Sequence, residues 1–168
     1  MVSKKSTLGF IILLVLCTCL MGIFTPVSAE TLNFKAYGYP ITRQVLPTGN
    51  VEGHDLVLAS RGEFLVFENG DVATAIYVMS ADFNKGAGPY VNYKTIKFVD
   101  GSTIFVKTEG VMAPTGSKST SEIIRGTGRF EGAKGTMSIK AKWLPAEKGE
   151  IGTKGIGEGT LTYTLPSK

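Results

Sequence analysis

Apolar and polar residues alternate with a period of two along most of the chain after residue 30, and no stretch keeps the 3.6-residue period of an amphipathic helix. The clearest case is residues 137–143. There the apolar positions are Met137, Ile139, Ala141 and Trp143, and polar side chains lie between them. This alternation is typical of a strand with one buried face. The pattern therefore predicts an all-β domain.

About eight or nine strands are expected, which indicates an antiparallel barrel or sandwich rather than alternating strands and helices. Asn69-Gly70 and Asp100-Gly101 tolerate positive φ and predict two tight hairpins. Gly38-Tyr39-Pro40 is expected to interrupt the first strand, and residues 114–121 and 145–159 are expected to form loops. The predicted strands are 31–37, 41–46, 56–60, 63–68, 71–79, 90–99, 103–108, 137–143 and 160–165.

A glycine-rich run at residues 126–135 resembles a nucleotide-binding loop at first sight. A dinucleotide loop leads into a helix, whereas this run leads into an alternating strand, and its glycine spacing is G-x-G-x-x-x-G. We therefore interpret the glycines as corners that let a closing sheet bend. The four corner glycines are Gly126, Gly128, Gly132 and Gly135, with Phe130 and Trp143 expected as core neighbours.

The first 29 residues have the three parts of a secretory signal. Lys4 and Lys5 precede an apolar stretch at residues 8–24, and the small residues Val27 and Ala29 occupy the positions that a signal peptidase requires. The alternative is a retained membrane anchor, because the apolar stretch is just long enough to span a bilayer. We expect a signal peptide at 1–29, cleavage after Ala29, and one barrel domain at 30–168 in a secreted or periplasmic protein without a membrane span.

Removal of the signal changes the global composition. Both cysteines, Cys17 and Cys19, leave with it, so the domain must be held by its own core. The formal charge of +4 falls by two because Lys4 and Lys5 are lost. The remaining lysines are spread among acids and form no basic stripe, which argues against a nucleic-acid partner.

Few residues suit metal or hydrolytic chemistry. The single histidine, His54, lies between Glu52 and Asp55. Adjacent strand residues face opposite sides, so His54 and Asp55 are not expected to bind one metal ion. The chain also has no G-x-S-x-G elbow for a serine nucleophile. The sequence predicts neither a metal site nor a cofactor.

Three segments carry a resemblance to a known group of barrels. Residues 126–135 resemble the glycine-rich segment of plant allene oxide cyclases and, more loosely, that of dirigent proteins. Residues 97–104 and 157–163 resemble barrel strands of the same group, and the similarity covers about residues 52–165. The resemblance implies an eight-stranded antiparallel β-barrel of the calycin or allene oxide cyclase type, an apolar cavity and a homotrimer.

The cyclase activity is less well supported than the fold. The resemblance implies a catalytic glutamate on the first barrel strand, but no acidic residue lies between Thr31 and Arg43. Glu30 lies at the expected cleavage point, where we expect it to be disordered. The sequence thus favours a non-catalytic barrel that binds a small apolar ligand or serves as a structural module. The alternative is a cyclase-like isomerase or a dirigent-like coupling protein that shapes a reactive intermediate.

Four polar residues are candidate ligand contacts if the barrel turns them inward: Glu63, Tyr77, Tyr93 and Arg125. A buried Glu63 could act as a general acid, whereas at a strand end it would be solvated. Tyr77 and Tyr93 could donate to a ligand carbonyl or simply fill space. Arg125 could bind a ligand carboxylate or lie on the outer face.

Overall fold

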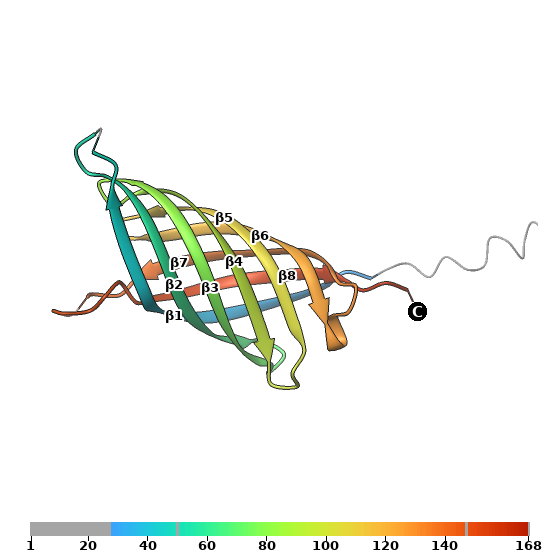
Figure 1. Cartoon of the computed structure of the whole chain (residues 1–168). Helices are drawn as coiled ribbons and strands as arrows, with labels where there is room; N and C mark the ends of the chain where they lie inside the picture. The colour runs from blue at the N-terminus through green and yellow to red at the C-terminus, as the bar shows by residue number, and fades with distance from the viewer. Residues whose placement is uncertain (1–27, 50, 147, 168) are drawn as a thin grey trace, which may run out of the picture.

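The computed structural model describes residues 28–49, 51–146 and 148–167, and all but the last two residues of the expected signal peptide lie outside these ranges. Eight strands form a closed barrel in chain order, each antiparallel to its neighbours (Figure 1). The expected fold class is confirmed. The strands are β1 (Glu30–Pro47), β2 (His54–Phe67), β3 (Val72–Asn84), β4 (Gly88–Phe98), β5 (Thr103–Ala113), β6 (Gly116–Thr127), β7 (Lys134–Trp143) and β8 (Gly155–Thr164).

The barrel closes where β1 pairs with β8, and this pairing uses only the first half of β1. Glu30 pairs with Tyr163 and the ladder ends at Gly38 opposite Gly155. Beyond Gly38, β1 continues to Pro47 with β2 as its ladder partner. The connection from β7 to β8, residues 144–154, lies at this end, opposite the C-terminus (Figure 1). One end of the barrel is therefore closed by strand pairing and the other is wider; we call the wider end the mouth.

The core fills the half of the lumen that is opposite the mouth. Leu65, Ile96, Ile104 and Leu161 are fully buried there. An aromatic row runs through Phe34, Phe67, Phe98, Phe130 and Tyr163, with successive ring centroids 4.8–5.3 Å apart. Aromatic pairs at such separations contribute about 0.5–1.5 kcal/mol each beyond their buried area. A smaller cluster around Val57, Met79 and Phe83 lies toward the mouth.

Two strands that the sequence divides are continuous. β1 runs through Gly38-Tyr39-Pro40 with a register shift between Pro40 and Thr42. Proline is tolerated here because the ladder between β1 and β8 ends at Gly38, so its missing N–H removes no ladder bond on that side. β2 likewise runs through Arg61-Gly62, which the sequence leaves between two strands.

The expected loops at 114–121 and 145–159 are partly wrong. β6 begins at Gly116, and its serines Ser119 and Ser121 are buried in the lumen instead of lying in a loop. Because the inward positions of β6 hold polar residues, the sequence lacks the alternation of apolar and polar residues that identifies a strand. β8 begins at Gly155, where Gly155, Gly157 and Gly159 take the inward positions, and an added Cβ at each would crowd side chains of neighbouring strands.

The glycine run connects β6 to β7 and forms no phosphate-binding loop. Gly128–Phe130 make one turn of 3₁₀ helix between the two strands. At Gly126 an added Cβ would lie 1.9 Å from the carbonyl oxygen of Phe130, so only glycine fits there. Gly128 has a φ of +64°, which also favours glycine. Phe130 is core as expected, but Trp143 is not its neighbour, because it lies at the other end of β7, in the mouth.

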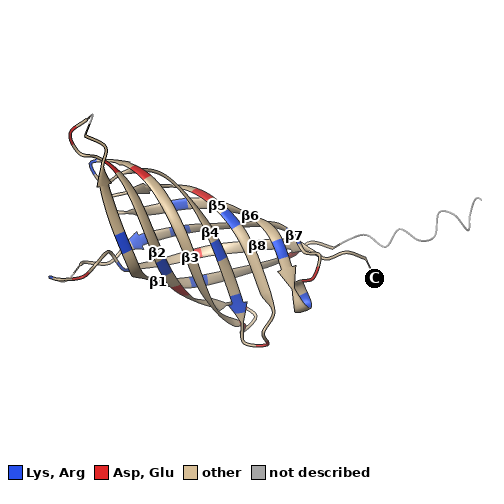
Figure 2. Ribbon diagram, in the orientation of Figure 1, with Lys and Arg blue, Asp and Glu red and all other residues tan. Residues whose placement is uncertain are grey.

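No helix in the described part of the chain is long and apolar enough to cross a membrane. Lysine and arginine are distributed over most strands and form no single stripe (Figure 2).

We predict that Gly126→Ala lowers the free energy of unfolding by about 1–3 kcal/mol, because the new methyl group overlaps a backbone carbonyl that has no room to move. Gly38→Ala is the matched control, since its Cβ would meet nothing closer than 3.7 Å. Urea denaturation measures both. Equal stability of the two variants would contradict the proposed close approach at Gly126.

Candidate functional site

A group of polar side chains interrupts the apolar lumen between its two hydrophobic clusters. β2 contributes Arg61 and Glu63, β3 contributes Tyr77, and β4 contributes Asn92 and Lys94. Each occupies an inward position of its strand, because it shares the parity of buried apolar residues. We call these five residues the polar belt. They line an inner cavity of about 30 Å³, which has room for a water molecule.

Glu63 and Lys94 form the centre of the polar belt. Lys94 Nζ donates to Glu63 Oε2 at 2.5 Å, and the two side chains are only 3% and 9% exposed, respectively. Lys94 Nζ also lies 4.9 Å from the ring centroid of Tyr77. Burial raises the pKa of the Tyr77 phenol well above its ordinary value, and the Glu63 carboxylate adds to this rise. Tyr77 therefore remains a neutral hydrogen-bond donor in the lumen.

Arg61 lies between the polar belt and the mouth. Its Nη2 donates to the carbonyl oxygen of Thr153 at 2.6 Å, and its guanidinium carbon lies 5.7 Å from the ring centroid of Trp143. Its Nε is buried and has no hydrogen-bond partner among the described residues, as is also true of Asn92 Oδ1. Buried polar atoms without partners are rare and costly, so these two atoms mark a place where a further polar group fits.

A cavity of about 210 Å³ lies at the mouth and reaches Arg61 from outside. Its apolar walls come from Val57, Met79, Phe83, Met112 and Trp143. Arg61, Met79, Met112 and Trp143 also line the inner cavity, so the two spaces share a boundary. The volume is below the 300–1,000 Å³ typical of drug-sized ligands, so the mouth suits a smaller molecule.

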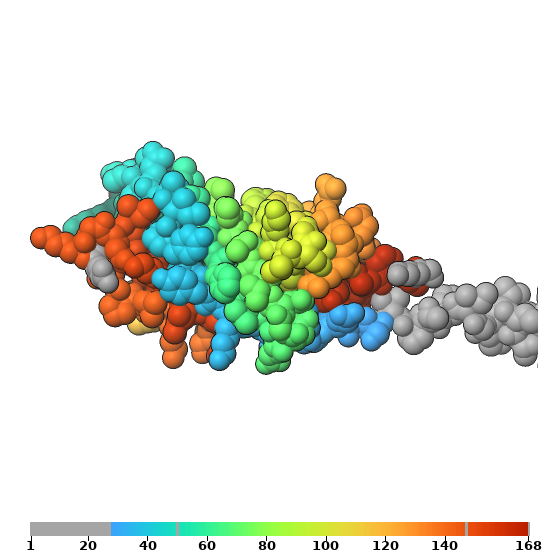
Figure 3. All heavy atoms as spheres, turned by 90° about the horizontal axis from the view of Figure 1, so that it is seen from below, coloured from blue at the N-terminus to red at the C-terminus, as the bar shows by residue number. Residues whose placement is uncertain are grey.

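The connection between β7 and β8 forms one wall of the mouth. Gly152 lies against Pro40 and Arg43 of β1, and Thr153 accepts the hydrogen bond from Arg61. The orange connection and the cyan part of β1 lie together in the space-filling view (Figure 3). Trp143 is fixed beside it, because its Nε1 donates to the carbonyl oxygen of Ala113 at 2.9 Å.

A shallow depression of about 720 Å³ lies on the outside of the barrel over β6, β7, β8, β1 and β2. Lysines and glutamates of opposite charge line it, including Lys35, Lys140 and Glu158. It is open to solvent, where such charges are hydrated and bind small molecules weakly. We therefore place the candidate site in the lumen and its mouth.

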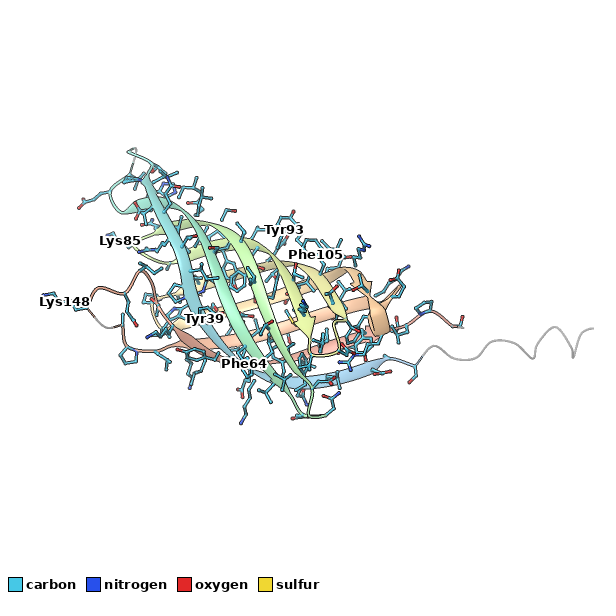
Figure 4. The ribbon with its side chains drawn as sticks, turned by 60° about the horizontal axis from the view of Figure 1, so that its bottom comes forward. Tyr39, Phe64, Lys85, Tyr93, Phe105 and Lys148 are labelled. Atoms are coloured by element: carbon cyan, nitrogen blue, oxygen red, sulfur yellow. The ribbon has the colours of Figure 1, made fainter. Side chains whose placement is uncertain are left out.

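The structure brings two of the four candidate residues together and separates the other two. Glu63 and Tyr77 both lie in the polar belt. Tyr93 is 51% exposed on the outer face and stacks on Phe105, with ring centroids 6.2 Å apart (Figure 4). Arg125 is also exposed on the outside, because β6 shifts register between Ile123 and Arg125. Neither Tyr93 nor Arg125 reaches the lumen.

The expectation that Glu30 is disordered is wrong. Glu30 is the first residue of β1, and its Oε2 accepts a hydrogen bond from the Tyr163 hydroxyl at 2.5 Å. Burial, with the adjacent Glu30 carboxylate, raises the pKa of Tyr163 to about 12. This pair lies at the end opposite the mouth, so Glu30 closes the barrel and does not line the candidate site.

Arg61, Asn92 and Lys94 are site residues that the sequence reasoning missed. The signal was present in the alternation of β4, where Asn92 and Lys94 share a face with Ile96 and Phe98. The same alternation places Tyr93 on the opposite face. Arg61 was missed because residues 61–62 were left between two strands.

No group of three or more histidine, cysteine, aspartate or glutamate side chains among the described residues is arranged to hold a metal ion. His54 instead pairs with Asp82 on β3, with 2.5 Å between His54 Nε2 and Asp82 Oδ1.

Comparison with known proteins identifies similar folds. No family model matches the chain, and no curated protein matches its sequence. Among solved structures, the pterocarpan synthase dirigent protein GePTS1 has a TM-score of 0.56 and 15% identity, covering 88% of this chain and 96% of that one. The pterocarpan synthase dirigent protein PsPTS1 has a TM-score of 0.53 and 16% identity, covering 86% of this chain and all of that one.

A third similar structure is a protein of unknown function from the DUF3224 family of Shewanella oneidensis MR-1. Its TM-score is 0.52 at 18% identity, covering 84% of this chain and all of that one. These similarities establish that the chain has the barrel fold of dirigent proteins. At these identities they establish the fold alone.

We predict that Lys94→Met lowers the free energy of unfolding by about 3–5 kcal/mol, because it leaves the Glu63 carboxylate buried without its cation. The double variant Glu63→Gln/Lys94→Met should recover most of this loss, because no uncompensated charge remains. Thermal and urea denaturation measure the free energy of unfolding of the single and the double variant.

Lys107→Met is the control, because Lys107 and Glu109 form an ion pair of similar length, 2.7 Å, on the surface. We expect this variant to leave the unfolding midpoint almost unchanged. If Lys94→Met behaved in the same way, the ion pair in the lumen would not be the buried contact described above.

Proposed function

We propose that this barrel is a secreted protein that binds one small, mostly apolar molecule at its mouth without converting it. The observation that carries the proposal is the mouth cavity, whose apolar walls lead to buried polar atoms without partners. Apolar walls with a few convergent polar groups are the usual make-up of a small-molecule site. The aromatic core fills the rest of the lumen, so binding is confined to the mouth and the polar belt.

Secretion is supported by the position of the first strand. β1 begins at Glu30, directly after the expected cleavage site at Ala29, so removal of residues 1–29 would leave every barrel strand intact. The absence of cysteine from residues 30–168 means that the fold needs no disulfide in an oxidising compartment.

The second candidate function is the guidance of a reactive intermediate, as in a cyclase or a dirigent protein. The polar belt favours it, because Tyr77 and Lys94 offer donors to a developing negative charge inside the lumen. Such chemistry can act through positioning and needs no nucleophile. We rank it second because the inner cavity beside these donors is small.

We further propose that copies of this chain associate through an outer apolar belt. The outer apolar belt consists of outward-facing side chains on β8 and β1–β5. Seven are exposed, Tyr37, Tyr39, Phe64, Ile76, Val78, Tyr93 and Ile156, and Phe105 is half-buried. Tyr39, Phe64, Tyr93 and Phe105 lie along this face in Figure 4. Contiguous exposed apolar surface of this kind usually marks a protein interface.

The ligand-binding proposal predicts that the protein purified without detergent from its expression host carries a small apolar molecule, which native mass spectrometry detects as a defined mass increment. Trp143 is the only tryptophan and lines the mouth, so its fluorescence reports occupancy directly. Met79→Phe should fill part of the mouth without adding a second tryptophan, and should weaken both signals. A protein that carries no ligand, and whose fluorescence responds to no small apolar probe, would contradict the proposal.

The association proposal predicts a multimer by light scattering that Val78→Lys dissociates, because Val78 is 62% exposed and would introduce a charge into the interface. Thr120→Lys on β6 is the control, since this exposed residue lies outside the outer apolar belt. A wild-type protein that remains monomeric at all concentrations would refute this interface.

A further inference from the structure

The charges around the lumen do not balance. The charged side chains that line the inner and mouth cavities, within the described residues, are Arg43, Arg61, Glu63 and Lys94. Glu63 and Lys94 neutralise each other in their ion pair. Arg43 and Arg61 add two positive charges, and no acidic side chain other than Glu63 lines the two cavities within the described residues. A site with this excess favours a negatively charged ligand over a neutral or cationic one.

Arg61 contributes more than Arg43 to the preference for an anion, because Arg61 is buried. It is only 9% exposed, and a buried charge without a counter-charge is costly. The Thr153 carbonyl, the Trp143 ring and the Tyr77 phenol compensate only part of its charge, since none of them carries a net negative charge. Arg43 lies at the exposed rim and contributes mainly to attraction from a distance.

The donors of Arg61 have a geometry that suits one class of anion. Nε has no partner, and Nη2 donates to the backbone carbonyl oxygen of Thr153. The guanidinium group also interacts with the Tyr77 hydroxyl, which is neutral. In a guanidinium group Nε and Nη2 form one edge, which can donate two parallel hydrogen bonds to the two oxygens of a carboxylate.

We propose that the ligand of the mouth is a small amphiphilic carboxylate, whose carboxylate binds the Nε and Nη2 edge of Arg61 and whose apolar part lies against Met79, Met112 and Trp143. This inference rests on the proposed ligand-binding function and specifies its ligand class. Nη2 carries two N–H groups, so it can donate to the carboxylate and to the Thr153 carbonyl oxygen at the same time.

The test uses three probes that share one apolar part and differ in charge: 4-phenylbutyrate, 4-phenylbutanol and 4-phenylbutylammonium. Calorimetry and Trp143 fluorescence measure their dissociation constants on the wild-type protein. We expect the carboxylate to bind about tenfold or more tightly than the alcohol, because a charge-assisted pair of hydrogen bonds replaces neutral ones. The ammonium probe should bind more weakly than the alcohol.

Two variants test whether Arg61 causes the preference for the carboxylate probe. Arg61→Met should abolish the preference for the carboxylate over the alcohol, because methionine keeps an apolar side chain but has no N–H donors or positive charge. Arg125→Met is the matched control, an exposed arginine on the outer face, and should behave like the wild type. Circular dichroism checks that both variants fold.

The outcomes separate the inference from the function on which it rests. If the wild-type protein binds the alcohol and the carboxylate equally well, the carboxylate inference is overturned and the ligand-binding proposal is retained. If none of the three probes binds, the ligand-binding proposal itself fails for molecules of this size. Because the probe comparison is made on the wild-type protein, the inference remains decidable even if Arg61→Met does not fold.

Discussion

The pairing of β1 with β8 determines the shape of this barrel. It extends from Glu30 to Gly38 and then ends, although β1 itself continues to Pro47. Where the pairing exists, strands approach closely and large aromatic side chains fill the lumen. Where it ends, the wall is completed by the connection at residues 144–154, and space remains at the mouth. The filled core and the candidate site therefore both follow from the incomplete pairing of β1 with β8.

Much of the fold could be predicted from the sequence because alternation survives wherever one face of a strand is apolar. β7 is the clearest example, and the hairpin turns at Asn69-Gly70 and Asp100-Gly101 also connect strands as expected. Alternation failed for β6 and the start of β8, where serine or glycine occupies the inner positions. The inward residues of β6 are polar because the lumen beside them is polar, and those at the start of β8 are small because the lumen beside them is crowded. A single sequence does not show which side chains face each other across a lumen.

The candidate site was harder to predict than the fold. Glu63 and Tyr77 were recognised because an acid and a phenol stand out among apolar residues. Lys94 was overlooked because a lysine in a strand is normally assumed to face solvent. Its burial depends on Glu63, which is 31 residues away in the chain and comes into contact only when β2, β3 and β4 curve around the lumen. The contact depends on how the strands are arranged around the lumen, and the spacing of Glu63 and Lys94 in the sequence does not reveal it.

The part of β1 that extends past β8 has a consequence for the behaviour of the protein at high concentration. A strand edge with unpaired N–H and C=O groups is a template to which another chain can add, and it is a common starting point for aggregation. Pro40 lies at the beginning of this edge, together with the register shift that follows it, and Gly152 lies against it. Proline offers no donor and the shift disturbs the spacing of the others, so this irregularity, which lies just beyond the end of the β1–β8 ladder, protects the exposed edge from pairing with a second molecule.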